Sequence, residues 1–246
     1  MKPIVFSDLD DTLFQTARKM EETPREDLLA SVATNGSHSY MTEAQSAQFD
    51  WLNSTTRLIP VTARSTEALS RCKLPFKDYL VASNGAVILG PDGTPDPLWM
   101  QRQQGISMEW GKMLGALDTY VAQKENADTS LRHWIVTEMD LPIYFCVKSN
   151  IGEDRLDDIE VKLDRLVSGE LFKHRNGNNL AYMPHRTSKR AAVEYLIDML
   201  ADARTPIWGM GDSMTDLPFM RACQMMVIPV ESQVDLEFKE RNPSHV

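Results

Sequence analysis

Cysteine and histidine are sparse in this chain of 246 residues, and both are scattered along it. The three cysteines, Cys72, Cys146 and Cys223, are odd in number and show no Cys-x-x-Cys spacing. Disulfide frameworks and structural zinc sites need cysteines or histidines at paired, short spacings, which argues against both kinds of site here. We expect the thiols to be free and buried.

Long apolar runs and an excess of basic residues are also missing. We find no run of about 18 apolar residues and no basic start followed by an apolar segment, and therefore expect no membrane span, no signal peptide and a cytoplasmic location. The 26 basic residues are outnumbered by 35 acidic ones, for a formal net charge of -9. That charge repels phosphate backbones and anionic membranes, so we expect no nucleic-acid partner and no membrane partner.

The sequence does contain a buried-strand pattern at residues 4–7 that is followed at once by acids. Asp8, Asp10 and Asp11 place three carboxylates within four positions. Like charges this close are unfavourable unless a cation or hydrogen-bond donors compensate them, and Mg²⁺ is a suitable cation. An acidic surface turn is the simpler alternative. Thr12 and Leu13 exclude an EF-hand calcium loop, which needs Asp or Asn and then Gly at those positions.

Polar residues also follow other predicted strands or begin a later helix. Thr62 ends the second apolar run, and Asp212 and Asp216 follow the last one. Lys189 stands in the first turn of a predicted helix, where its charge opposes the helix dipole unless it faces an anion. Because parallel strands end at one edge of a sheet, these residues are predicted to lie near Asp8. Taken singly, Thr62 and the acids are equally compatible with helix caps, and Lys189 with a solvated side chain.

The order of predicted elements indicates an α/β protein with an inserted second domain. Strands and helices alternate toward both ends of the chain, which favours a Rossmann-like parallel sheet. Residues 101–183 instead show the order αββαββ, which predicts two helices on one face of an antiparallel sheet. The predicted domains are a discontinuous core, 1–100 and 184–246, and an α+β cap, 101–183.

Three shorter segments complete the prediction. Residues 41–53 have helical periodicity, with Thr42 as the N-cap. Residues 87–99 are predicted to form a hairpin whose second strand is 97–99. Residues 18–40 form an excursion between the first strand and the first helix, which we interpret as a second lid or an oligomer contact.

In this order, four motifs resemble the signature motifs of the haloacid dehalogenase-like superfamily. They are Asp-x-Asp-x-Thr after the first strand, Thr62 after a later strand, Lys189 at a helix start and Gly-Asp-x-x-x-Asp after the last strand. The resemblance covers nearly the whole chain outside residues 18–40. The Ser-Asn-Gly-Ala stretch at 83–86 and the large insert resemble subfamily IIB, whose members carry a C2B cap and include Cof-type and sucrose-phosphate phosphatases.

The resemblance implies a Mg²⁺-dependent phosphatase that acts on a small phosphate ester, above all a sugar phosphate. It implies that Asp8 is the nucleophile, which forms an aspartyl-phosphate, and that Asp10 is first the general acid and then the base. Mg²⁺ is implied to bind the carboxylates of Asp8 and Asp212 and the backbone carbonyl of Asp10.

The remaining motif residues are implied to act on the phosphoryl group. Thr62 and Lys189 would hold it, and Asp216 would orient Lys189 or a metal-bound water. Two positions depart from the family pattern. Thr215 stands where members often have Asn, which loosens the assignment of contacts to metal-bound water, and Asp11 replaces a common Gly.

Specificity and two alternative functions complete the expectations. Arg64, Asn84, His185 and Arg186 flank the predicted cleft and are candidates to meet the phosphate or the sugar hydroxyls, although the two arginines are equally compatible with surface positions. A phosphomutase would use the same aspartyl-phosphate and pass the phosphoryl group to a sugar hydroxyl instead of water. A non-catalytic binding protein is the other alternative, which the joint presence of all motif residues disfavours.

Overall fold

The protein is described here by a computed structural model that covers residues 2–124, 131–167 and 169–241. Its contacts divide the chain into two compact units. The first comprises Met1–Asp96 and Lys189–Val246, and the second is Pro97–Ser188. The second unit is therefore an insertion into the first.

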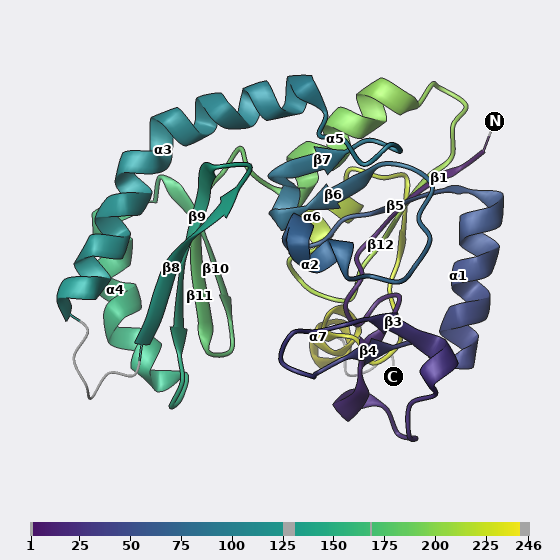
Figure 1. The fold of residues 1–246 in the computed structure, drawn as a ribbon, viewed down its shortest axis with the longest axis horizontal. Helices are drawn as coiled ribbons and strands as arrows, with labels where there is room; N and C mark the ends of the chain where they lie inside the picture. The colour runs from purple at the N-terminus through teal and green to yellow at the C-terminus, as the bar shows by residue number, and fades with distance from the viewer. Residues whose placement is uncertain (1, 125–130, 168, 242–246) are drawn as a thin grey trace. The chain divides into compact units, whose positions relative to one another are not determined.

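A four-stranded parallel sheet forms the centre of the first unit (Figure 1). In spatial order its strands are β13 (Met225–Val227), β12 (Ile207–Met210), β1 (Ile4–Ser7) and β5 (Arg57–Pro60). All four residues of β1 are inaccessible to solvent, as expected for a strand inside a parallel sheet with both faces covered. Ser7 is paired with both Pro60 and Met210, so the residues after these three strands share one edge of the sheet.

The helices of the first unit confirm the predicted α/β pattern. They are α1 (Glu43–Thr55), α2 (Thr66–Ser70), α5 (Lys189–Leu200), α6 (Leu217–Met220) and α7 (Gln233–Arg241). The predicted cap of α1 is confirmed: Gln45 N donates to Thr42 Oγ1 at 3.1 Å, and Thr42 N donates to Gln45 Oε1 at 2.9 Å. This reciprocal capping box satisfies backbone donors that lack a partner in the first helical turn.

The excursion between β1 and α1 is a small antiparallel sheet of its own. Its strands lie in the order β2 (Gln15–Thr16), β4 (Ser39–Tyr40) and β3 (Leu29–Ser31), with short 3-10 helices η1 (Ala17–Lys19) and η2 (Glu26–Leu28) between β2 and β3. Backbone hydrogen bonds tie it to the segment after α2: Lys73 N donates to Ala30 O at 2.7 Å, and Val32 N donates to Arg71 O at 3.2 Å. The excursion is thus an integral part of the first unit.

The prediction of a hairpin strand at 97–99 is wrong. Strand β7 (Val87–Leu89) pairs instead with the preceding β6 (Leu80–Ala82), and a bridge from Leu89 to Pro95 ends the extended chain. Pro97 then begins the helix α3 (Pro97–Lys124), at a position that suits proline because an amide hydrogen there would have no helical acceptor.

The second unit confirms the predicted αββαββ order. After α3 come β8 (Leu131–Glu138), β9 (Leu141–Ser149), η4 (Asp154–Leu156), α4 (Asp157–Val167), β10 (Leu171–Asn176) and β11 (Asn179–Pro184). The four strands form an antiparallel sheet in the order β10-β11-β9-β8, and α3 and α4 lie on the same side of it (Figure 1). Leu114, Leu163 and Phe145, all fully buried, join the two helices to the sheet in one apolar core.

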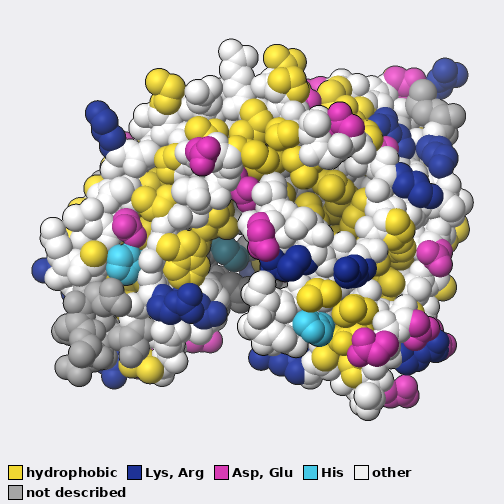
Figure 2. Space-filling model, in the orientation of Figure 1, with side chains coloured by type: hydrophobic (Ala, Val, Ile, Leu, Met, Phe, Trp, Pro, Cys, Tyr) yellow, Lys and Arg dark blue, Asp and Glu magenta, His cyan; other side chains and the backbone are white. Residues whose placement is uncertain are grey.

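In the described parts of the chain, none of the helices has the length and apolar character that crossing a bilayer requires. On the face drawn in Figure 2, acidic and basic side chains are interspersed with apolar ones.

Candidate active site

Asp8, Lys189 and Asp216 form a buried hydrogen-bonded group in the first unit. Asp8 follows β1, Lys189 is the first residue of α5, and Asp216 directly precedes α6. The Lys189 ammonium donates to Asp8 Oδ1 at 2.6 Å and to Asp216 Oδ1 at 2.7 Å. The three residues are only 6%, 9% and 0% exposed, respectively, so these charges interact with little screening by water.

Burial and the neighbouring charges shift the pKa values of this group. Burial raises the pKa of Asp8, Lys189 lowers it and Asp216 raises it again, so that it stands at about 7. Burial acts to lower the pKa of Lys189, but attraction to Asp8 and Asp216 outweighs burial and raises that pKa. Lys189 is therefore charged, while Asp8 ionises fully near neutral pH only when another cation compensates it.

The turn after β12 holds Asp216 in place. A Cβ atom on Gly211 would lie 2.5 Å from the Cβ of Asp216, so only glycine allows the turn to pass this close to the aspartate. Ser213 donates to Asp216 Oδ2 through its backbone N at 3.1 Å and its hydroxyl at 2.7 Å. With Lys189 on Oδ1, both oxygens of Asp216 are engaged.

Asp212 adds a third carboxylate to this group. Asp8, Asp212 and Asp216 each offer an oxygen within 4.8 Å of the others. Burial, together with repulsion from Asp216 and Asp11, raises the pKa of Asp212 to about 6. Three carboxylates share the single positive charge of Lys189. The group therefore fits a hard divalent cation with oxygen ligands, such as Mg²⁺, and Asp8 and Asp212 have the free acceptor oxygens.

Asp10 is held by Arg64. The guanidinium forms a two-pronged ion pair with the carboxylate, from Nε to Oδ2 at 2.8 Å and from Nη2 to Oδ1 at 2.7 Å. Its remaining nitrogen, Nη1, donates to the hydroxyl of Ser31 in β3 at 2.5 Å, and the guanidinium lies over the ring of Phe14. Arg64, a candidate for contact with phosphate or sugar, directs its donors in this structure to Asp10 and to the excursion.

Thr62 and Asn84 are brought together by the backbone. Thr62 is 1% exposed, and its hydroxyl accepts from Arg64 N at 3.1 Å. Asn84 N donates to Thr62 O at 3.0 Å. Ser83, Asn84 and Gly85 all have positive φ, of 49°, 56° and 93°, a conformation that asparagine and glycine adopt more readily than most residues. The turn after β6 is therefore fixed against the loop that carries Thr62.

His185 and Arg186 belong to the second unit, and their described contacts lie within it. His185 Nε2 lies 3.4 Å from Gly169 O, and its ring packs edge-on against Phe172. Arg186 forms an ion pair with Glu109 of α3. Arg186 is thus already paired with a carboxylate of its own unit.

Three residues that contact the motif residues or their neighbours were not predicted from the sequence. Ser31 binds Arg64, Ser213 binds Asp216, and Lys19 of η1 forms an ion pair with Asp11 at 2.5 Å. Ser213 was detectable, because Ser-x-x-Asp is a common local capping pattern. Ser31 and Lys19 lie in the excursion, where the sequence offers no such signal.

The fold and the site together define a class. A parallel α/β sheet with two aspartates after its first strand, a lysine at a later helix start and an αββαββ insertion are the features of a haloacid dehalogenase-like phosphohydrolase of subfamily IIB. Residues 1–245 match the family described as sucrose-6F-phosphate phosphohydrolase, and the chain belongs to that family. It is accordingly a phosphoric monoester hydrolase.

Solved structures of low sequence identity share this fold. The sucrose-phosphatase of Synechocystis sp. PCC6803, solved with sucrose and phosphate, is 17% identical with a TM-score of 0.60, over 98% of this chain and 97% of that one. A subclass IIB sugar phosphatase is 12% identical with a TM-score of 0.62, over 96% and 90% of the two chains. The C-terminal domain of the C. albicans trehalose-6-phosphate phosphatase is 12% identical with a TM-score of 0.60, over 90% and 73%. No curated protein matches the chain by sequence.

Proposed function

We propose that this protein hydrolyses a sugar phosphate in a Mg²⁺-dependent reaction that passes through an aspartyl-phosphate on Asp8. The observation that carries the proposal is the buried contact between Asp8 and Lys189 at the edge of the parallel sheet. A carboxylate attacks a phosphate ester only when positive charge offsets the repulsion between the two anions. Family membership and the sucrose-phosphatase fold support a sugar phosphate as substrate.

In the first step, a carboxylate oxygen of Asp8 forms a bond to phosphorus while the bond from phosphorus to the sugar oxygen breaks. Asp10 donates its proton to the departing oxygen, which leaves as a hydroxyl. In the second step Asp10 takes a proton from water, which attacks the aspartyl-phosphate and releases inorganic phosphate and free Asp8. Lys189 offsets the charge of the phosphoryl group, and the Thr62 hydroxyl would donate a hydrogen bond to one of its oxygens.

A divalent cation fits beside these residues. Asp8, Asp212 and the backbone carbonyl of Asp10 would hold Mg²⁺, which supplies positive charge to the transferring phosphoryl group. Asp216 supports the site through Lys189, because its second oxygen is occupied by Ser213.

The first test is phosphate release from a panel of sugar phosphates, including sucrose 6-phosphate and trehalose 6-phosphate, with Mg²⁺ and with EDTA. We expect Mg²⁺-dependent release that Asp8→Asn abolishes. Asp50→Asn, the same change at an exposed site on α1, serves as the matched control and keeps the activity. Activity that survives Asp8→Asn would refute the nucleophile assignment. Transfer to a sugar hydroxyl without phosphate release would refute hydrolysis.

Arg64 has a distinct role in this proposal, as the residue that positions Asp10. If Asp10 is held less firmly, it donates its proton to the leaving group less effectively. This slows departure of a sugar alkoxide, which needs a proton, more than departure of a phenolate such as p-nitrophenolate. Arg64→Lys, which cannot form the two-pronged pair, is therefore expected to lower kcat for a sugar phosphate by about tenfold or more while p-nitrophenyl phosphate is spared. Equal losses on both substrates, with a raised KM, would instead indicate that Arg64 binds phosphate.

A further inference from the structure

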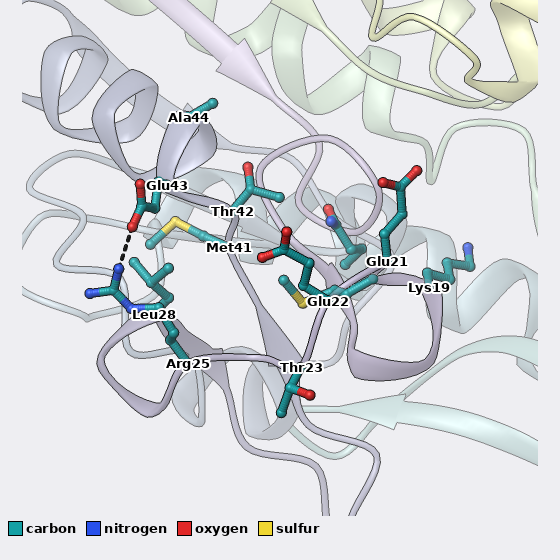
Figure 3. A pocket seen from close by; sticks show the side chains of 12 residues that line it. Lys19, Glu21, Glu22, Thr23, Arg25, Leu28, Met41, Thr42, Glu43 and Ala44 are labelled. Atoms are coloured by element: carbon teal, nitrogen blue, oxygen red, sulfur yellow. Dashed lines mark hydrogen bonds and ion pairs between the residues drawn. The ribbon is translucent and has the colours of Figure 1, made fainter.

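A pocket of about 580 Å³ lies in the first unit, between the excursion and the start of α1. Figure 3 shows the loop residues Glu21, Glu22 and Thr23 on one side of it, and Thr42 and the residues after it, at the start of α1, on the other. Its size is within the range of small-molecule sites. None of the residues placed in the proposed phosphatase site lines this pocket.

The lining combines an apolar surface with hydrogen-bonding groups of both kinds. Met20, Leu28 and Met41 supply the apolar part. The remaining lining residues are polar or charged except Ala44: Gln15, Lys19, Glu21, Glu22, Thr23, Arg25, Thr42 and Glu43. Apolar surface with a few convergent polar groups is the usual composition of a site for a small organic ligand.

The charges of the lining restrict the class of ligand. Lys19 is paired with Asp11, and Arg25 with Asp27 and Glu43, whereas among the described residues Glu21 and Glu22 have no ion pair. The two unpaired carboxylates repel a phosphate or any other anion.

The hydrogen-bonding capacity of the lining residues restricts the class of ligand further. Carboxylates only accept hydrogen bonds, and the ammonium and guanidinium groups only donate them. A hydroxyl does both, so a ligand rich in hydroxyls can use every polar group of this rim. An ammonium ligand would use only the acceptors and would leave the donors of this rim without a partner in the ligand.

We propose that this pocket binds a neutral, hydroxyl-rich ligand, a sugar or polyol, outside the catalytic site. The ligand's carbon face would lie on Met20, Leu28 and Met41, and its hydroxyls would donate to Glu21 and Glu22. Binding reaches the catalytic loop through Lys19, because this lining residue is paired with Asp11, the residue directly after Asp10. The dephosphorylated product of the proposed reaction belongs to this ligand class, so the product would regulate the enzyme through this pocket. Regulation by the product rests on the proposed function, whereas binding itself does not.

The test is titration calorimetry of sucrose, trehalose and glucose, each without phosphate, into the full-length protein. Ala44→Trp places an indole in the pocket from the exposed start of α1, and Ala47→Trp makes the same change on an exposed position of the same helix that does not line it. We expect at least one of these sugars to bind the wild type and Ala47→Trp with equal affinity. The same sugar should bind Ala44→Trp at least about tenfold more weakly, because the indole takes up the volume of the ligand.

A second variant tests the chemistry without changing the shape of the pocket. The double variant Glu21→Gln, Glu22→Gln keeps the side-chain size, removes both charges and is expected to weaken the same sugar severalfold. A circular-dichroism melt confirms that each variant is folded. No binding by any of the three sugars, equal affinity of Ala44→Trp and Ala47→Trp, or binding of spermidine in place of sugars would overturn the proposal. Because calorimetry needs no turnover, it gives its answer whether or not phosphate release is observed.

Discussion

Replacement of Lys189 by methionine is the most informative perturbation of this fold. The ammonium lies between Asp8 and Asp216, which it contacts at 2.6 Å and 2.7 Å. Methionine has a similar length and fills the same space but cannot donate a hydrogen bond. The variant Lys189→Met therefore leaves two buried carboxylates facing each other without compensation.

The expected cost follows from the burial of all three groups. Removal of one partner from a buried ion pair typically costs about 3–5 kcal/mol, since the remaining charge stays desolvated. A typical domain is stable by only about 5–15 kcal/mol, so the first unit should be severely weakened. With a urea dependence of about 3 kcal/mol per molar, the midpoint of unfolding should fall by about 1–1.7 M.

The loss should also depend on pH in a defined direction. In the wild type the pKa of Asp8 is about 7, above its ordinary value of 3.8, so the folded state binds more protons than the unfolded state between these values. Stability from this group is thus greatest at low pH and declines as pH rises through about 7. Without Lys189 the pKa of Asp8 rises further, so the difference between variant and wild type should be larger at pH 8.5 than at pH 5.5.

Urea unfolding in metal-free buffer at these two pH values measures both effects. Lys173→Met is the matched control, because Lys173 also contacts two carboxylates, Glu160 at 2.7 Å and Asp164 at 2.6 Å, but is 36% exposed. Exposed pairs contribute about 1 kcal/mol or less, and this variant should show little pH dependence. Equal midpoints for Lys189→Met and the wild type, or a loss that shrinks as pH rises, would refute the reasoning.

Three further predictions follow from single contacts. Gly211→Ala should displace Asp216, lower phosphate release strongly and destabilise the fold by about 1–3 kcal/mol in urea unfolding, whereas an unchanged midpoint would show that the turn can give way. Mg²⁺ should raise the melting temperature of the wild type, with a stabilisation of about 2.7 kcal/mol when its concentration is a hundred times its dissociation constant. The variant Asp212→Asn should lose this shift in melting temperature. An equal shift in both proteins would exclude Asp212 as a ligand. Thr42→Ala should cost about 1 kcal/mol in thermal or urea unfolding by removing the cap of α1, and no loss would mean that the capping box contributes nothing.

The sequence was sufficient for those parts of the fold that depend on periodic patterns. The buried run of β1, the cap and periodicity of α1 and the αββαββ insertion were all predicted, since each involves local spacing of apolar residues. The start of α3 was not. Pro97 and Trp99 follow a turn and are compatible with either a strand or a helix. The complete burial of Trp99 could not be read from the local pattern.

The site, like the fold, has features that local sequence patterns predict and features that they do not. The approach of Asp8 to Lys189 could be anticipated, because parallel register brings the strand ends to one edge and a lysine in the first helical turn is favoured when it faces an anion. The pKa of Asp8 could not, because it depends on how completely the surrounding chain excludes water. Lys19 and Ser31 could not be anticipated either, since they lie in an excursion whose strands have two or three residues each, too few to show a period.

The position of Arg64 could be predicted from the sequence, but the group that its guanidinium contacts could not. Its place near Asp10 is a property of the backbone, because β1 and β5 end side by side. Its choice of partner depends on side-chain reach, and on Ser31, which binds the one guanidinium nitrogen that Asp10 leaves free. With that nitrogen engaged, the guanidinium presents its two-pronged edge to Asp10 and not to a phosphate. The excursion, whose role the sequence left open between a lid and an oligomer contact, thereby acquires a third role: it orients the arginine that orients the proposed general acid.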